Sequence, residues 1–465
     1  MNVPLMMMAI TLLVALTAFL FRKRAHVSAW MAAGGTFLLG LLVLVVPLEE
    51  AFDLAILQVR FDNEFVLLGR SLLLDEPARG FIGFLFLLAG VLLASSTYSK
   101  TNRFFSPLIV LLSAILAAAM MMKPFLYAAI LMELAAIVAV LVLAAPEYPA
   151  RRAGMRLLFV YTLAMMAILL AGWLLGVVGV TGATPEIARW TAALLALGFA
   201  VLMAIPPFHY WLSVAADESH PYVVVTLLLF MQTVGVFFLL RFLDTYEWFR
   251  IQSSTYDAMR FIGIGMGWFG AFMMLGQVRM TRVLAYALIM DMGVVLMAAS
   301  MADQQGLELM MQFTAARVPA VVLWAMNLTS FIRVVGDDTH AKLTGAAHRH
   351  RWRSLFLLLG MVLAFGVPFS PVFPGRWVMV QHFASTDLLV LATMFAMWII
   401  SGSVVLRWYR ILHAESAGNQ ALVGREAEFY LSCILLGTTF LVGMFPQLVL
   451  PWMEGIVQGL SNLIP

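Results

Sequence analysis

The sequence contains few of the residues that soluble domains and redox centres require. Charged side chains account for only 11% of its 465 residues, whereas a typical soluble chain carries about a quarter. Its single cysteine, Cys433, excludes a disulfide framework within the chain, a CxxC metal site and a cysteine-held iron–sulfur cluster. We expect Cys433 to be a buried apolar thiol. The scarcity of charge excludes an ordinary soluble protein.

Apolar residues dominate what is present. Hydrophobic residues make up 63% of the chain, the mean hydropathy is +0.97, and apolar runs of about 20 residues, long enough for transmembrane helices, recur along it. The sequence therefore predicts an all-α polytopic membrane protein with about fourteen transmembrane helices, and an acidic loop over residues 47–79. The predicted spans lie near residues 3–21, 28–47, 80–97, 105–122, 124–145, 155–178, 188–206, 221–242, 258–276, 281–301, 308–331, 354–370, 386–408 and 429–447.

The basic residues predict how these helices are oriented. The first apolar run has its basic cluster, residues 22–24, after it and not before it, which is opposite to a signal peptide. Loops after the odd-numbered spans are basic, so we expect them in the cytoplasm and both termini on the outer side. One loop on the basic side, residues 213–220, is an exception because it contains the acidic residues Asp217 and Glu218. The apolar tail, residues 448–465, is expected to lie along the membrane interface.

Proline interrupts two of the predicted spans. Pro206 and Pro207 end the seventh, and Pro368 and Pro371 interrupt the twelfth; a helix cannot run straight through such positions. Broken helices at membrane depth often mark the transport site of a transporter. Because the breaks lie five spans apart, we predict two inverted five-helix repeats, the fourth to eighth and the ninth to thirteenth spans. The segments are a three-helix N-terminal part (1–98), the first repeat (105–242), the second repeat (257–411) and a C-terminal helix with its tail (412–465).

A few polar side chains fall within or beside the apolar runs, where buried charge is costly and therefore a functional candidate. Glu133 is either a structural carboxyl or a proton-exchanging group with a pKa raised by burial, and the same two interpretations stay open for Asp291. His209 follows the first break, and its position next to a proline favours a role as a hydrogen-bonding anchor of the loop over a role as a proton relay. Arg376, after the second break, either lines a cavity or extends to the interface. Gln232 is a neutral polar candidate at the same depth.

The segment around the first break resembles a known family. IPPFHYWLSVAADESHPYVVV is similar to the VPFHxWLPDAxxxAPTPVSA signature of antiporter-like proton-conducting membrane subunits, found in complex I (N, M and L types), membrane-bound hydrogenases and Mrp antiporters. QVRMTRVLAYALIMDMG and GVPFSPVFPGRWVMV resemble two further family segments, within a resemblance that covers roughly residues 65–410 and favours the N or M type. It implies a fourteen-helix core, inverted repeats and a proton path along the membrane midplane.

The chain departs from the family pattern at its titratable positions. Leu202 stands where the resemblance places a lysine on the broken seventh helix, and Gln232 where it places a basic residue of the eighth. Thr281 replaces a second lysine and Asp291 a histidine. Arg376 replaces the lysine of the twelfth span, and arginine titrates much less readily.

These departures leave three functions open. Glu133 has no evident basic partner, because Lys123 lies ten residues earlier, about 15 Å along a helix. The resemblance places Glu133 at the fifth-span glutamate of the family. The retention of this glutamate and both broken helices favour a subunit that translocates protons coupled to electron transfer in a complex I-like NADH:quinone oxidoreductase, with altered or lost pumping. The missing lysines favour a non-conducting scaffold subunit of such a complex. A cation/proton antiporter subunit of the Mrp type, or a standalone transporter, is the third alternative.

We expect no cofactor on this chain, so that NADH, flavin, iron–sulfur and quinone chemistry would belong to partner subunits. The loops around His340, His348 and His350 are expected to be solvated and not to bind metal. The expected partners are other membrane-arm subunits and the lipid bilayer, and not nucleic acid. The resemblance implies the inner (plasma) membrane of a prokaryote or an equivalent energy-transducing membrane.

Overall fold

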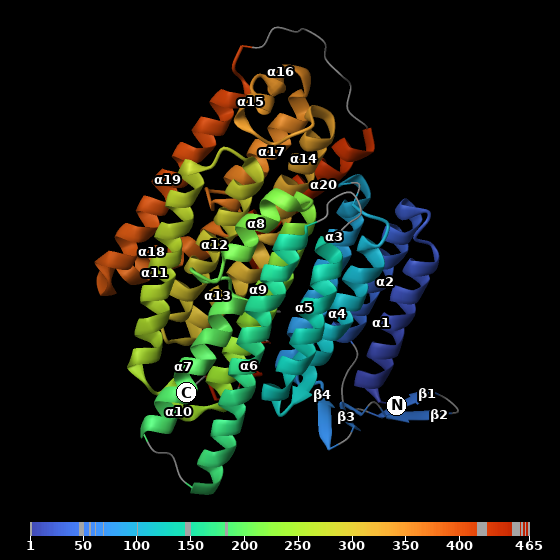
Figure 1. Cartoon of the computed structure of the whole chain (residues 1–465), viewed down its shortest axis with the longest axis vertical. Coiled ribbons are helices and arrows are strands. Elements are labelled where there is room, and N and C mark those ends of the chain that lie inside the picture. Colours follow the sequence, from blue (N-terminus) through green and yellow to red (C-terminus); the bar gives the residue numbers. More distant parts are fainter. Residues whose placement is uncertain are drawn as a thin grey trace.

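The structure is a computed structural model in which most residues lie in helices that run close to one long axis (Figure 1). It describes residues 2–45, 51–54, 57–60, 62–67, 69–99, 101–144, 150–181, 185–415 and 426–448, and also Ile456, Gly459, Leu460, Asn462 and Leu463. The helices and strands of the first part are α1 (Val3–Leu20), α2 (Ala25–Val45), β1 (Ala51–Leu54), β2 (Leu57–Arg60), β3 (Glu64–Leu67), β4 (Arg70–Leu73), α3 (Glu76–Ser99), α4 (Phe105–Met121), β5 (Met122–Lys123), α5 (Ala128–Leu143), α6 (Arg151–Thr181), α7 (Pro185–Leu202), α8 (Tyr210–Glu218), α9 (Pro221–Thr245) and α10 (Glu247–Arg250).

The second part of the chain is also helical. Its elements are α11 (Ser253–Gly276), α12 (Met280–Ala299), α13 (Gln304–Ala316), α14 (Val318–Val335), α15 (His340–Leu343), α16 (Ala346–Arg349), α17 (Arg351–Ala364), α18 (Phe373–Thr386), α19 (Leu388–Leu412) and α20 (Glu426–Met444). Within the described residues, ten helices are long and apolar enough to cross a membrane, with α13 and α14 counted as one. Each predicted span coincides with one helix or with a broken pair; fourteen crossings and two repeats stay predictions.

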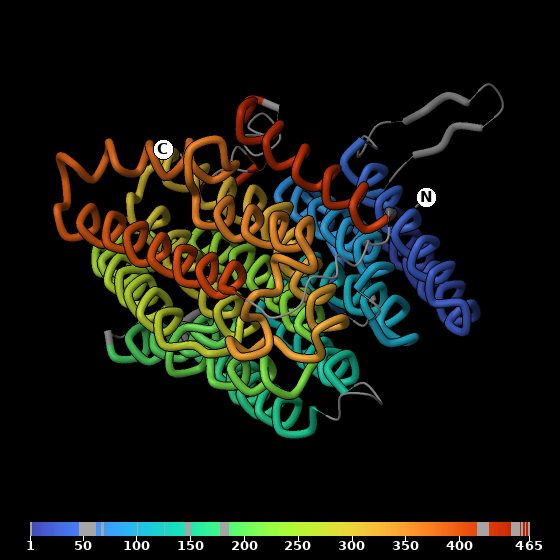
Figure 2. The backbone as a smooth tube through the Cα atoms, turned by 90° about the horizontal axis from the view of Figure 1, so that it is seen from above, coloured from blue at the N-terminus to red at the C-terminus, as the bar shows by residue number. Residues whose placement is uncertain are grey.

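The most deeply buried helices lie in the middle of the bundle. The apolar stretches of α9 and α12 are 100% and 94% buried, whereas only 33% of those of α1, α6 and α19 and 22% of that of α20 is buried. Viewed from above, the blue N-terminal helices lie at one end of the molecule and the orange α18 and red α19 at the other (Figure 2). Residues on α9 and α12 are therefore enclosed by protein, and polar groups there must find partners inside the chain.

Both proline segments break their helices, as the sequence predicts. The first break separates α7 from α8 and leaves residues 203–209 outside helices; the second separates α17 from α18 over residues 365–372. Left-handed backbone at Ala204 (φ 57°), Gly366 (φ 73°) and Phe369 (φ 71°) turns the chain at these points. A third interruption, at Arg317 between α13 and α14, falls inside the predicted span 308–331 and was not predicted.

Several expectations need correction. The predicted acidic loop 47–79 contains four short strands, in an antiparallel pair β1–β2 and a sheet of order β3–β4–β5; four-residue strands are too short to show a clear period in sequence. The residues expected to form an acidic loop, 213–220, include the second half of α8. Cys433 is exposed on α20 and not buried. Most of the tail 448–465 lies outside the described residues.

Candidate functional site

A buried ion-pair cluster occupies the centre of the second part of the chain. Asp291, in the middle of α12, accepts a hydrogen bond from Arg376 Nη2 on α18 (2.9 Å, to Oδ1) and one from Arg317 Nη1 (3.3 Å, to Oδ2). The side chains of Asp291, Arg376 and Arg317 are only 7%, 3% and 1% exposed. We call these three residues the central cluster. It places one carboxylate between two guanidinium groups inside the protein.

The helix interruptions bring these side chains together. Arg317 lies between α13 and α14, and Arg376 lies in the first turn of α18, just after the second break. Arg376 Nη1 also donates to the carbonyl of Phe365 (2.6 Å), at the end of α17. Carbonyls in the last turn of a helix lack intrahelical partners, so Arg376 satisfies one of them. Arg376 thus donates hydrogen bonds both to a free carbonyl at the end of α17 and to the carboxylate of Asp291.

Gly366 allows Arg376 to reach this position. A Cβ atom at Gly366 would lie 2.8 Å from Arg376 Cδ, and the residue has φ 73°. Gly366→Ala is therefore expected to destabilise the protein by about 1–3 kcal/mol through backbone strain and to displace Arg376. Thermal unfolding in detergent measures this. Gly402→Ala is the matched control, because a Cβ atom at this position of α19 would have no other atom within 4 Å; equal melting temperatures for the two variants would contradict the packing argument.

Glu133 lies apart from the central cluster. Its Oε1 accepts a hydrogen bond from Thr162 Oγ1 on α6 (2.6 Å), while its Oε2 is buried without a hydrogen-bond partner. In the part of the chain that the structure describes, no cation lies within ion-pair distance of Glu133. Lys123 pairs with Asp75 instead (3.3 Å). The prediction that Lys123 does not reach Glu133 agrees with this pairing.

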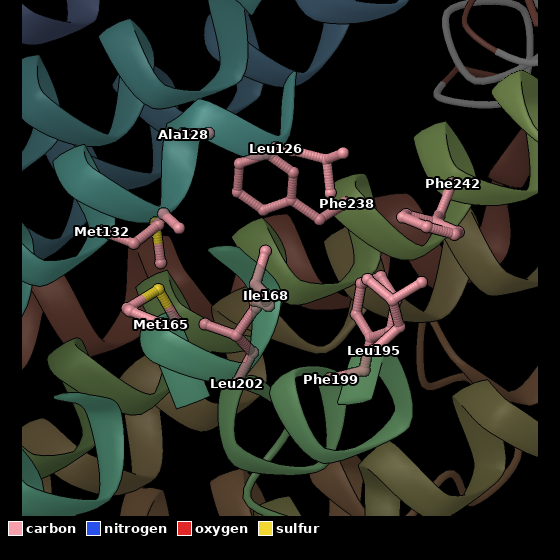
Figure 3. Close-up of a pocket in the computed structure, with 11 residues that line it drawn as sticks. Leu126, Ala128, Met132, Met165, Ile168, Leu195, Phe199, Leu202, Phe238 and Phe242 are labelled. Atoms are coloured by element: carbon pink, nitrogen blue, oxygen red, sulfur yellow. The ribbon is translucent and has the colours of Figure 1, made fainter. Parts of the chain in front are cut away.

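An apolar cavity lies beside the helix of Glu133. It has a volume of about 20 Å³ and is lined entirely by apolar side chains from α5, α6, α7, α9 and the turn before α5. Figure 3 shows Met132, Met165 and Leu202 around the same space. Although a single water molecule needs only about 10–15 Å³, it also needs two to four polar partners, and apolar cavities stay dry. Leu202 therefore faces an apolar space without polar partners for water.

The other two polar candidates are His209 and Gln232. His209 precedes α8, and its ring packs against Phe269 (centroids 4.7 Å apart), while its buried Nδ1 has no hydrogen-bond partner. Gln232, on α9, donates a long hydrogen bond of 3.4 Å from Nε2 to the carbonyl of Leu288 on α12. Leu288 is three residues before Asp291, so Gln232 contacts α12 within one turn of the central cluster. His209 and Glu133 do not contact it.

The interpretation of Arg376 as a residue that extends to the interface is wrong, because its side chain is only 3% exposed. A groove of about 480 Å³ lies beside the second break, lined by residues such as Gly366, Pro368 and Trp398, and Arg376 is not among them. The guanidinium turns inward because Asp291 and the Phe365 carbonyl satisfy it there. The expectation of solvated histidine loops is also wrong in part, since His350 is buried against Phe331. Within the described residues, no group of three or more metal-ligating side chains is present.

Comparison with models of known protein families identifies the family of this chain. Residues 149–401, more than half of the chain, match the model for the NADH:quinone oxidoreductase/Mrp antiporter transmembrane family. The chain belongs to this family. The match includes both broken helices and the whole central cluster, but not Glu133.

Individual relatives in the antiporter family are distant. The chain is 23% identical over 264 residues to NADH-quinone oxidoreductase subunit M of Buchnera aphidicola subsp. Baizongia pistaciae (55% of this chain, 51% of the relative). It is 24% identical over 255 residues to NADH-quinone oxidoreductase subunit N of Maricaulis maris (54% of this chain, 53% of the relative). The chain thus spans about half the length of the curated relatives it matches.

Solved structures share the whole fold. A chain of the archaeal membrane-bound sulfane sulfur reductase superposes with a TM-score of 0.82 at 16% identity, covering 99% of this chain and 98% of that one. A chain of the Mrp complex from Dietzia sp. DQ12-45-1b superposes with a TM-score of 0.79 at 14% identity, covering 98% of this chain and 98% of that one. A chain of respiratory complex I from Thermus thermophilus superposes with a TM-score of 0.76 at 20% identity, covering 98% of this chain and 100% of that one. With ten apolar helices and this fold, the protein is an integral multi-pass membrane protein.

Sequence reasoning missed Arg317, although an arginine two residues before a proline inside an apolar span was a visible signal. It also missed the partners of the acidic residues near helix ends. Asp217, the exception to the basic-loop rule, pairs with Arg282 and lies 3.5 Å from Arg279. Outside the membrane-spanning helices, burial opposes ionisation of Asp75, but Arg241 and Lys123 outweigh it and lower its pKa. Asp217 and Asp75 thus each have basic partners.

Proposed function

We propose that this chain is a membrane-arm subunit of a multisubunit, complex I-like respiratory complex and that it does not pump a proton of its own. The observation that carries the proposal is the apolar cavity at Leu202. A proton switch at Glu133 needs a titratable base beside this glutamate, which would shift its pKa. The cavity at Leu202 offers neither such a base nor polar groups that could hold water. The intact fold supports a role in the assembly of the complex.

The central cluster supports the same function. Arginine does not release its proton in proteins, so Arg317 and Arg376 cannot act as relays in the way that a lysine can. Their hydrogen bonds hold the Asp291 carboxylate on both oxygens. Fixed positive charge at the centre of the chain also repels a proton or metal cation that approaches through the second break. The second part of the chain therefore offers a fixed charge cluster in place of a titrating pair.

The key prediction concerns Glu133. Glu133→Gln is expected to leave the proton-to-electron ratio of the purified complex, reconstituted in vesicles, unchanged, because Thr162 is the only hydrogen-bond partner among the described residues and an amide can keep that bond. The ratio is measured from proton uptake and electron transfer in the same vesicles. An uncoupler must collapse the signal in every sample, which shows that the assay is sensitive.

Glu64→Gln provides the matched control, because Glu64 is an exposed carboxyl on β3. A lower ratio for Glu133→Gln than for Glu64→Gln would overturn the non-pumping proposal and favour a subunit that translocates protons. Co-purification of redox subunits with the chain tests the other part of the proposal. Purification with non-redox antiporter subunits alone would indicate a cation/proton antiporter instead.

A further inference from the structure

The second break, residues 365–372, reaches the outer surface of the bundle. On one side the carbonyl of Phe369 packs against α20 so closely that a Cβ atom at Gly443 would overlap it. On another side the break forms one wall of the groove of about 480 Å³, and α19 forms the other wall. Pro368, which lines the groove, is exposed, and Phe369 beside it is 62% exposed. This chain therefore covers the break only in part.

Both walls of the groove lie at membrane depth. α17 begins at Arg351, and its 14 residues carry the chain about 21 Å before the break begins at Phe365. On α19, the lining residues Trp398 and Gly402 follow Leu388, the first residue of that helix, by ten and fourteen positions, or about 15 and 21 Å. The hydrocarbon core of a bilayer is about 30 Å thick. The groove therefore opens into the hydrocarbon region.

Non-helical backbone at this depth needs hydrogen-bond partners. Within the part of the chain that the structure describes, no hydrogen bond involves the backbone N–H of Val367 or of Phe369. Lipid tails accept no hydrogen bonds, so irregular backbone occurs in the hydrocarbon region only inside protein or beside a water-filled cavity. Among the residues that line the groove, only Ser401 and Trp398 carry polar side-chain groups, too few to hold a body of water. Protein is the cover that remains.

The rest of this chain does not provide that cover. Described residues of the C-terminal tail lie against other helices: a Cβ atom at Gly80 of α3 would overlap Ile456, and the backbone N–H of Asn462 donates to Asp244 of α9 (3.1 Å). The segment between α19 and α20, residues 416–425, contains asparagine, glutamine and arginine, whose polar groups an apolar groove would leave without partners. The cover must therefore come from another chain.

We propose that a transmembrane helix of another membrane subunit packs along the second break and α19 in the assembled complex. It places a large apolar side chain in the groove and supplies the acceptors that Val367 and Phe369 lack. Leu406 and Ile399, seven residues apart on one face of α19, are 59% and 70% exposed, and the same helix would bury them. The inference rests on the proposed membership of a multisubunit complex and adds which face of the chain takes part.

Site-specific photo-crosslinking in the purified complex tests this face directly. Leu406 is replaced by p-benzoyl-phenylalanine, and the product of illumination is identified by mass spectrometry. The expected product joins α19 to a transmembrane segment of a co-purified subunit. Capture of lipid alone, or of a second copy of this chain, overturns the inference while co-purified redox subunits leave the proposed function intact. Absence of any co-purified subunit refutes both.

A second experiment fills the groove. A Cβ atom at Gly402 would have no other atom within 4 Å, so Gly402→Trp is expected to leave the melting temperature of the chain unchanged. Because the indole would occupy the place of the partner's side chain, we expect the apparent affinity for the partner subunit, measured by its recovery with the tagged chain, to fall at least ~10-fold. Gly437→Trp, at an exposed and equally open position of α20, is the matched control and should keep the wild-type recovery. Wild-type recovery with Gly402→Trp, or an equal loss with Gly437→Trp, would contradict a helix docked at this groove.

Discussion

Asp291→Asn is expected to destabilise the protein by about 3–5 kcal/mol, the largest loss for any single substitution proposed for this chain. The variant leaves Arg317 and Arg376 facing a neutral amide, with both guanidinium groups almost fully buried. Removing one partner of a buried ion pair costs more than the pair contributes, because the remaining charge stays out of water. Thermal or denaturant unfolding of the purified chain in detergent, together with its yield in the assembled complex, measures the effect.

Two comparisons make this result specific. Asp257→Asn is the matched control: Asp257 pairs with Arg260 at a side-chain exposure of 51%, and such exposed pairs contribute less than about 1 kcal/mol. In the Arg317→Gln background, Asp291→Asn should cost less than in the wild type, because only one arginine is left unpaired. Equal losses in the two backgrounds would contradict the shared charge cluster.

Leu202→Lys is expected to destabilise the protein by about 3 kcal/mol, because a lysine buried among apolar side chains in the membrane loses its hydration without gaining a partner. Leu202 is 1% exposed and faces a cavity lined only by apolar side chains, so the new ammonium group would find neither water nor an acceptor. Leu202→Met, which keeps volume and polarity, is expected to cost less than about 1.5 kcal/mol. Unfolding of the two variants in detergent compares them directly.

The same substitution tests function in the assembled complex. A single lysine at this position is not expected to build a proton switch, because Glu133 does not line the cavity that Leu202 faces. We therefore expect the proton-to-electron ratio of Leu202→Lys to equal that of Leu202→Met. A higher ratio in the lysine variant would show that the missing base alone had disabled the pump.

The sequence was sufficient to predict a helical, multi-pass membrane protein. Apolar runs of helical length located the ten helices that are long and apolar enough to cross a membrane in the described part of the chain, because a membrane helix needs a continuous apolar surface and no distant residue changes that requirement. Proline located two broken helices for an equally local reason, the loss of a backbone donor. The family resemblance rested on these segments, and the family model confirmed it over residues 149–401.

The pairing of charges was decided by the tertiary structure alone. Arg376 and Asp291 are 85 residues apart and Arg317 is 26 residues from Asp291, so sequence spacing could not show that they meet. Nor could it show that Lys123 pairs with Asp75, or that Leu202 faces a cavity with purely apolar walls. The sequence by itself determined where helices form and break, because those depend on neighbouring residues. Which buried charge is balanced and which is in surplus depends on the packing of helices that are remote in the chain.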